Sequence, residues 1–197
     1  YKHHAGQETR IDPSVSNIVD VYLLERTYDN LFRIWLQEGG SKPTVSTPDQ
    51  LRISYSGTLN PLKSLSDQII YHPVKYKILF GSNADEQLQA TFKVVKNPKT
   101  NVSDAVVKTR VIAAINEFFA LDNWDFGDAF YFTELAAYIH NQLAPDLLTA
   151  VIVPNQSGQG FGSLFQLDSA ADEIFISGAT VDDVSIITAL GANQLAA

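Results

Sequence analysis

The alternation of hydrophobic and polar residues predicts a strand followed by a helix near the start of the chain. Residues 18–24 are rich in β-branched side chains and alternate between two faces, as a half-buried strand does. Apolar side chains then recur at intervals of three and four residues, which is typical of one helix face. They are Tyr28, Leu31, Phe32 and Trp35. We expect Thr27 to cap this helix and Gly39-Gly40 to end it.

The middle of the chain combines an irregular segment with a β-rich one. Residues 41–66 contain three prolines among many Ser and Thr, which predicts a surface crossing with one short helical turn at 47–49. Residues 68–80 predict a strand in which Pro73 forces a bulge or an edge position, because proline cannot donate to the ladder. After a glycine turn, we expect a partner strand at 88–95.

The second half of the chain predicts two helices and several short strands. Ser103 caps the clearer helix, which ends near Leu121, and the other helix runs from about Thr133 to Leu143, before Pro145. We expect an inner strand at 147–153, short strands at 165–167 and 173–177, and a last turn or strand at 181–190. Interleaved helices and strands predict an α+β fold with layered mixed or antiparallel strands and two or three packed helices.

The sequence is compatible with one α+β domain or with two subdomains. Polar residues 1–16 are expected to be a connector or the end of an upstream element, and the absence of Met, even at position 1, predicts a longer polypeptide. One α+β region over 17–197 fits the remaining pattern, as does a division into two subdomains near 41–66. The 197 residues, 45% of them hydrophobic, provide enough apolar material for a sizeable core in either case.

Basic residues are confined to the first part of the chain. All 14 Lys and Arg lie at or before Arg110, whereas residues 111–197 carry 11 acidic residues and no basic one. Nucleic acid is not an expected partner, because phosphate neutralisation needs a basic stripe that residues 111–197 cannot supply. The acidic part either faces water or meets a basic surface of this chain or of another subunit. No apolar stretch approaches the ~18 residues of a membrane span, so no membrane partner is expected.

Closely spaced carboxylates form the most suggestive cluster for metal or acid–base chemistry. They are Asp122, Asp125, Asp128 and Glu134. Their spacing fails the EF-hand register, so we predict no metal site and expect Asp128 or Thr133 to cap the helix that follows.

The histidines and the known catalytic motifs give no stronger signal. The histidines are His3, His4, His72 and His140. A hydrolase would have to bring His140 beside Asp125 or Glu134 in a pocket. The sequence contains no Cys and no H-E-x-x-H, G-x-S-x-G or P-loop pattern. We therefore predict no catalytic residue and no cofactor.

Aromatic side chains near an expected glycine-rich loop at 155–162 suggest a binding surface. They are Tyr131, Phe132, Phe161, Phe165 and Phe175. Such rings stack on sugars, and large apolar side chains beside flexible glycines also suit a subunit interface. We expect the span 159–175 to be covered by a protein partner, with the interface residues Phe161, Phe165 and Phe175.

Five stretches of the sequence together carry a family resemblance. They are DPSVSNIVDVYLL at 12–24, FYFTEL at 130–135, VIVP at 151–154, FGSLF at 161–165 and DEIFIS at 172–177. Over most of residues 11–190 the chain resembles the C-terminal part of the baseplate wedge subunit of T-even-like contractile-tail phages, within the baseplate J-like family. The specificity lies in the run of matches, since no single stretch is a catalytic signature.

The resemblance implies a virion structural protein without catalysis. Such a protein is assembled in the host cytoplasm into the tail baseplate, where it builds the ring of wedges through contacts with its own copies, as a homodimer, and with other wedge proteins. Compared with a full wedge subunit, these 197 residues do not include the long upstream portion, so the resemblance implies no contact with the tail tube or hub. The residues leave one alternative open, a carbohydrate-binding tail or adhesin module.

Overall fold

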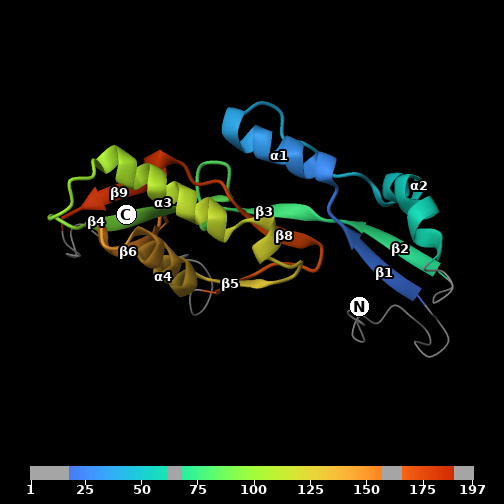
Figure 1. Ribbon diagram of the computed structural model, residues 1–197. Coiled ribbons are helices and arrows are strands. Elements are labelled where there is room, and N and C mark those ends of the chain that lie inside the picture. The colour runs from blue at the N-terminus through green and yellow to red at the C-terminus, as the bar shows by residue number, and fades with distance from the viewer. Residues whose placement is uncertain (1–17, 62–67, 157–165, 189–197) are drawn as a thin grey trace. The chain divides into compact units, whose positions relative to one another are not determined.

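The chain divides into two compact units, residues 1–74 and 75–197, which we call the N-unit and the C-unit. Figure 1 shows the computed structural model, which describes residues 18–61, 68–156 and 166–188. Within these ranges, helices are interleaved with strands, and the strands form several small parallel and antiparallel sheets. This arrangement confirms the expected α+β class.

The N-unit consists of a two-stranded parallel sheet with two helices. Its elements are β1 (Ile18–Leu23), α1 (Arg26–Glu38), α2 (Pro48–Leu59) and β2 (Gln68–Pro73). β1 pairs with β2 in parallel, and Leu51 of α2 is fully buried against Ile69 and Tyr71 of β2. Because α2 packs on β2, both belong to one unit, and the chain divides after Val74 rather than near 41–66.

The helix after β1 has the expected end but not the expected cap. α1 begins at Arg26, so Thr27 lies inside its first turn, and Glu25 occupies the N-cap position without a side-chain cap hydrogen bond. The prediction of a Thr27 cap is therefore wrong. Gly39 ends the helix with a φ of 77°, and its N–H donates to the carbonyl oxygen of Trp35 over 2.9 Å.

The expectation of an irregular crossing at 41–66 is also wrong, since 48–59 form α2. Thr47 caps this helix with a reciprocal pair of hydrogen bonds to Gln50. The Thr47 hydroxyl accepts from the Gln50 N–H at 3.3 Å, and the Gln50 side chain accepts from the Thr47 N–H at 2.8 Å. Pro48 follows the cap at a position that needs no backbone donor. Residues 47–50 therefore contain a complete helix start signal. The prolines and serines around it favoured an irregular segment in the sequence analysis.

The C-unit contains the remaining elements of the described chain. Its helices are α3 (Asp104–Phe118) and α4 (Phe132–Leu143), with short 3-10 helices at Glu86–Leu88, Leu121–Asn123 and Val181–Asp183. Its strands are β3 (Lys75–Leu79), β4 (Ala90–Lys96), β5 (Ala129–Tyr131), β6 (Leu147–Pro154), β7 (Gln166–Asp168), β8 (Glu173–Ser177) and β9 (Val184–Ile187).

The strand partners in the C-unit differ from those expected. Residues 88–95 do not pair with the strand before them, because β4 pairs antiparallel with β6 and parallel with β9. β3 instead pairs in parallel with β8, and β5 pairs antiparallel with β7. The sheet order β6-β4-β9 also places β6 on an edge, so the prediction of an inner strand at 147–153 is wrong for the described residues.

Aromatic rings dominate the core of the C-unit. Phe80, Phe92 and Phe130 are fully buried, and the Phe80 ring centroid lies 4.8 Å from that of Phe92 and 6.1 Å from that of Phe130. These edge-to-face contacts add to the stabilisation from apolar burial. α3 packs against β9 and α4 against β6, so both helices close the core over the three-stranded sheet (Figure 1).

Candidate functional site

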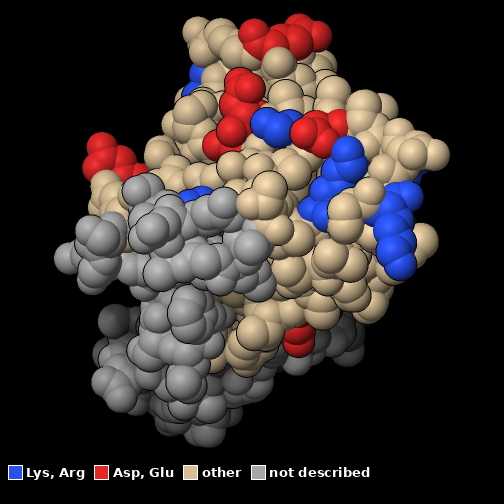
Figure 2. All heavy atoms as spheres, turned by 90° about the vertical axis from the view of Figure 1, so that its left-hand side faces the viewer, with Lys and Arg blue, Asp and Glu red and all other residues tan. Residues whose placement is uncertain are grey.

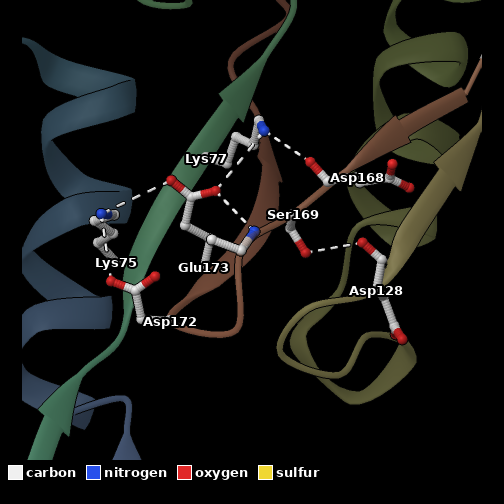
Figure 3. Close-up of polar contacts among 8 residues, drawn as sticks. Lys75, Lys77, Asp128, Asp168, Ser169, Asp172 and Glu173 are labelled. Atoms are coloured by element: carbon white, nitrogen blue, oxygen red, sulfur yellow. Dashed lines mark hydrogen bonds and ion pairs between the residues drawn. The ribbon is translucent and has the colours of Figure 1, made fainter. Parts of the chain in front are cut away.

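The parallel pairing of β3 with β8 brings basic and acidic residues from distant parts of the sequence together. We call Lys75, Lys77, Asp172 and Glu173 the β3–β8 charge cluster. The Lys75 ammonium lies 3.4 Å from the Asp172 carboxylate and 3.8 Å from that of Glu173. Lys77 lies 3.7 Å from Glu173, whose carboxylate is thus placed between two ammonium groups (Figure 3).

Hydrogen bonds to the backbone fix the loop beside this cluster. Lys77 Nζ donates to the Asp168 carbonyl oxygen over 2.8 Å, and the Ala170 N–H donates to Glu173 Oε2 over 3.0 Å. The N–H and hydroxyl of Ser169 both donate to the Asp128 carbonyl oxygen, at 3.0 and 2.8 Å (Figure 3). The charges of the cluster therefore hold the chain between β7 and β8 in place, and its Ser169 hydroxyl is bonded to backbone rather than to a general base.

Other acidic residues after Arg110 also meet basic residues of the same unit. Asp146 accepts hydrogen bonds from Arg110 over 2.9 Å and from the Thr100 hydroxyl over 2.6 Å. Figure 2 shows one face of the molecule on which basic side chains lie beside acidic ones. The sequence left open whether the acidic residues after Arg110 face water or contact basic residues of this chain or of another subunit. In the C-unit, several of them contact basic residues of this chain.

The four carboxylates singled out in the sequence do not gather into a metal site. The described part of the chain contains no group of three or more His, Asp or Glu residues that could hold a metal ion. Asp128 accepts from the Asp125 N–H over 2.8 Å, and α4 begins at Phe132 after Tyr131, with no side-chain cap. The prediction that Asp128 or Thr133 caps α4 is therefore wrong, because the Asp128 carboxylate closes its own turn.

The described histidines lie in different units. His72 Nε2 lies 2.9 Å from Asp20 Oδ1, and its ring stacks on Tyr22 with centroids 4.8 Å apart in the N-unit. His140 lies in the last turn of α4, and its Nδ1 is buried without a hydrogen-bond partner among the described residues. His3 and His4 lie outside those residues.

The helix geometry separates His140 from Glu134. Six residues of α-helix place the two side chains ~9 Å apart along the axis and about 120° apart around it. Asp125 precedes α4 and makes its hydrogen bond with Asp128 instead. The described geometry therefore offers no nucleophile–base pair around His140.

Two tyrosines have perturbed pKa values. Burial raises the pKa of Tyr55, and the nearby Glu25 carboxylate raises it further. Glu25, at the start of α1, accepts hydrogen bonds from Tyr55 of α2 at 3.4 Å and from the hydroxyl of Ser46, just before α2. It therefore links the start of α1 to α2 and to the segment that precedes α2. Burial likewise raises the pKa of Tyr138 on α4, and Glu117 of α3 adds to the rise. Both shifts favour the neutral phenol.

The predicted interface phenylalanines have different outcomes. Phe161 and Phe165 lie outside the described residues, so their interface role stays a prediction. Phe175 is 2% exposed, and its ring centroid lies 5.4 Å from that of Trp124 in the core of the C-unit. Of the other two rings considered for sugar stacking, Tyr131 is 39% exposed and Phe132 is buried. The described members therefore form no exposed row of rings.

Other apolar side chains on the C-unit surface were not identified from the sequence. The large exposed ones are Val106, Leu121, Tyr131, Leu148 and Val181. Leu148 lies on β6, which is the uncharged edge strand of its sheet. An uncharged run is typical of a buried strand as well, so only the sheet order distinguishes an edge strand from an inner one.

No protein-family model matches this chain, and no curated protein matches its sequence. Within 18–61, 68–156 and 166–188, no helix combines the length and apolar character needed to cross a bilayer. The resemblance to the baseplate J-like family therefore stays a prediction from the sequence.

Proposed function

We propose that this chain is a virion structural protein, part of a baseplate wedge subunit of a contractile-tail phage. In this role it joins copies of itself and neighbouring wedge proteins into the ring at the end of the tail. The observation that carries the proposal is the run of five matching stretches between residues 12 and 177. A run of matches in order along the chain is more specific than any single short motif.

Three of the five matched stretches lie in the described part of the C-unit, at positions compatible with this proposal. Residues 130–135 cover the end of β5 and the first turn of α4, 151–154 lie in β6, and 172–177 include all of β8. These segments form strands and the start of a helix of the C-unit. A resemblance at such positions concerns the framework of the fold, as expected for a structural relationship.

The surface of the C-unit also suits an assembly role. Protein interfaces combine apolar anchors with polar surroundings. Leu148 and Val181 are 51% and 44% exposed, while the β3–β8 charge cluster holds its carboxylates in local ion pairs. The unit thus presents exposed apolar side chains at Leu148 and Val181 and, on another sheet, carboxylates paired with lysines.

Immunogold electron microscopy of intact phage particles that encode this chain tests the proposed function. An antibody raised against the whole chain should label the baseplate end of contractile tails. The same antibody after adsorption with the purified chain provides the matched control. Label on the capsid, or no chain in purified particles, would contradict the proposal, and a glycan-dependent change of Trp fluorescence would favour the adhesin alternative.

A further inference from the structure

The edge strand β6 carries no charged side chain, and its two irregular positions, Leu148 and Pro154, lie near its ends. β6 runs for eight residues, LLTAVIVP, without a charged side chain, and among the described residues it pairs with β4 alone. Natural edge strands are usually shortened, charged or interrupted, because their free N–H and C=O groups can bind a further strand. Figure 1 shows β6 on the side of β4 opposite to β9. The long uncharged edge is therefore a candidate surface for strand addition.

The hydrogen-bond phase of the β4–β6 ladder identifies the free backbone groups. The Asn155 N–H donates to the Gln89 carbonyl oxygen over 3.0 Å, next to the pair Ala90↔Pro154. In an antiparallel ladder, hydrogen-bonded pairs alternate with pairs whose groups point outward. Thr149, Val151 and Val153 therefore bond to β4, whereas the N–H and C=O groups of Ala150 and Ile152 point away from it.

The side chains beside this edge are apolar on both faces of the sheet. Ala150 and Ile152 belong to the core side, under the helices. Val151 and Val153 lie on the opposite face and are half-buried. The nearest preceding charge, Asp146, is bonded to Arg110 and Thr100. A strand docked on this edge would meet apolar neighbours and no uncompensated charge from β6.

We propose that β6 pairs antiparallel with β6 of a second copy of this chain, with the two-fold axis at Val151. Ala150 of one copy then lies opposite Ile152 of the other, and each such pair exchanges both backbone hydrogen bonds. A second copy fits because an uncharged strand opposes no like charge when it pairs with itself. The described edges of β1, β3 and β8 carry Asp20, two lysines and Glu173, and β9, the other uncharged edge of the same sheet, has only four residues.

The neighbouring registers are less favourable than the one centred on Val151. An axis at Ile152 would place Ala150 opposite Pro154, which has no N–H to donate. An axis at Ala150 would place Ile152 opposite Leu148, the extra residue where the register of the β4–β6 pair shifts. Centring on Val151 uses the outward donors of both copies and sets Thr149 opposite Val153, a β-branched pair that suits a sheet surface.

This inference rests on the proposed function for the role of the dimer, because a ring of wedges needs contact between copies. Pairing through β6 is itself a property of the purified chain, so it can be tested separately. Failure of β6 pairing in solution would leave the immunogold result unchanged, and failure of baseplate labelling would leave the solution dimer unchanged.

Site-specific disulfide formation tests both the partner and the register. The sequence contains no Cys, so Val151→Cys introduces a single thiol. At the proposed axis, the two residues form a non-hydrogen-bonded pair with Cα atoms about 4.5 Å apart, within the range that a disulfide spans. We expect mild oxidation of the full chain to convert Val151→Cys into a reducible dimer.

The matched controls use the same strand and the same chemistry. Thr149→Cys and Val153→Cys should each stay monomeric after oxidation, but their mixture should form a disulfide-linked heterodimer, since these positions face each other. Leu121→Cys, on an exposed apolar site outside β6, should stay monomeric. Circular dichroism of the reduced variants should match that of the parent chain.

Sedimentation of the parent chain completes the test. A concentration-dependent dimer that Val151→Lys weakens at least about tenfold, while Val106→Lys does not, supports pairing through β6. A monomer at all concentrations overturns the inference. It is also overturned by a dimer in which Val151→Cys fails to cross-link, or in which Thr149→Cys alone cross-links as fast as Val151→Cys.

Discussion

A Cβ atom on Gly81 would lie 2.0 Å from the carbonyl oxygen of Gly178. This close approach occurs where β3 and β8 end, and the Gly178 N–H donates to the Leu79 carbonyl oxygen over 2.8 Å. Gly81 also has a φ of 68°, which side-chain-bearing residues adopt only with strain. Both the backbone conformation and the contact therefore require glycine at position 81.

The substitution Gly81→Ala should destabilise the C-unit by at least about 2 kcal/mol, because the left-handed conformation alone costs roughly 1–2 kcal/mol and the clash adds to it. Urea unfolding in a Trp35→Phe background measures this, since Trp124 then reports on the C-unit alone. The control is Gly57→Ala, inside α2 of the N-unit with nothing within 4 Å of the added Cβ, and its unfolding is followed by far-UV circular dichroism because Trp124 does not report on that unit. Equal stability of Gly81→Ala and the parent would contradict the close approach.

Glu173 should stabilise the C-unit more through its backbone contact than through its charge. Glu173→Gln keeps an oxygen that can accept from the Ala170 N–H but loses the ion pairs with Lys75 and Lys77. Exposed ion pairs contribute about 0–1 kcal/mol, so we expect a loss within that range that shrinks at high salt.

Glu173→Ala should cost roughly 1 kcal/mol more than Glu173→Gln and show a salt-independent part, because the backbone acceptor is removed too. Urea unfolding at low and high salt separates the two contributions. Arg52→Gln, which removes the exposed pair with Asp49 on α2, is the control and should change little. A larger loss for Glu173→Gln than for Glu173→Ala would refute this division.

Thr47 and Gln50 should stabilise α2 jointly. Thr47→Ala should weaken the helix by about 1 kcal/mol, as for other N-cap losses. Gln50→Ala should weaken it less, and the double variant should cost less than the sum of the two, because both hydrogen bonds belong to one capping box. Native-state hydrogen exchange of the α2 amides measures these effects. Thr58→Ala, exposed near the end of α2, is the control, and strict additivity would argue against the reciprocal cap.

The Tyr138 phenol should make stability fall at alkaline pH. Because its pKa is raised in the folded chain, the folded state holds the proton more strongly than the unfolded state, whose Tyr titrates near 10. Its contribution is therefore complete below pH ~10 and is lost as pH rises through the folded pKa. Tyr138→Phe should remove this part of the pH dependence.

Glu117→Gln should lower the pKa of Tyr138, because one cause of the rise is the Glu117 carboxylate. NMR titration of the ring carbons checks this, with Tyr55 as the internal control, since the pKa of Tyr55 responds to Glu25 instead. An unchanged Tyr138 titration in Glu117→Gln would show that burial alone causes the shift.

Local signals in the sequence identified most elements but not their partners. The spacing from Tyr28 to Trp35 predicted α1, and the Ser103 hydroxyl indeed accepts a hydrogen bond from the Val106 N–H at the start of α3. α2 was missed because Leu51 is its one buried residue, which leaves almost no periodic stripe. Helix starts and stops depend on near neighbours in sequence, so they can be predicted where the stripe is strong.

The candidate site could be predicted less well, because it depends on contacts between distant residues. Nothing near Glu173 in the sequence indicates that Lys75 lies beside it, since that contact follows from the β3–β8 register. Phe175 belongs to an apolar stretch that suits a core strand and a surface anchor equally, and only packing against Trp124 decides between them. The outward groups of β6 likewise depend on its alignment with β4.

The parallel pairing of β3 with β8 has a consequence for synthesis of the chain. Residue 75 pairs with residue 173, so the first strand of the C-unit leaves the ribosome long before its partner does. Contacts between residues so far apart in the sequence form slowly, and until they form, the apolar side chains of the earlier segment stay exposed. The C-unit therefore cannot complete its fold before β8 and β9 have emerged, because until then β3 lacks its partner strand and β4 lacks one of its two.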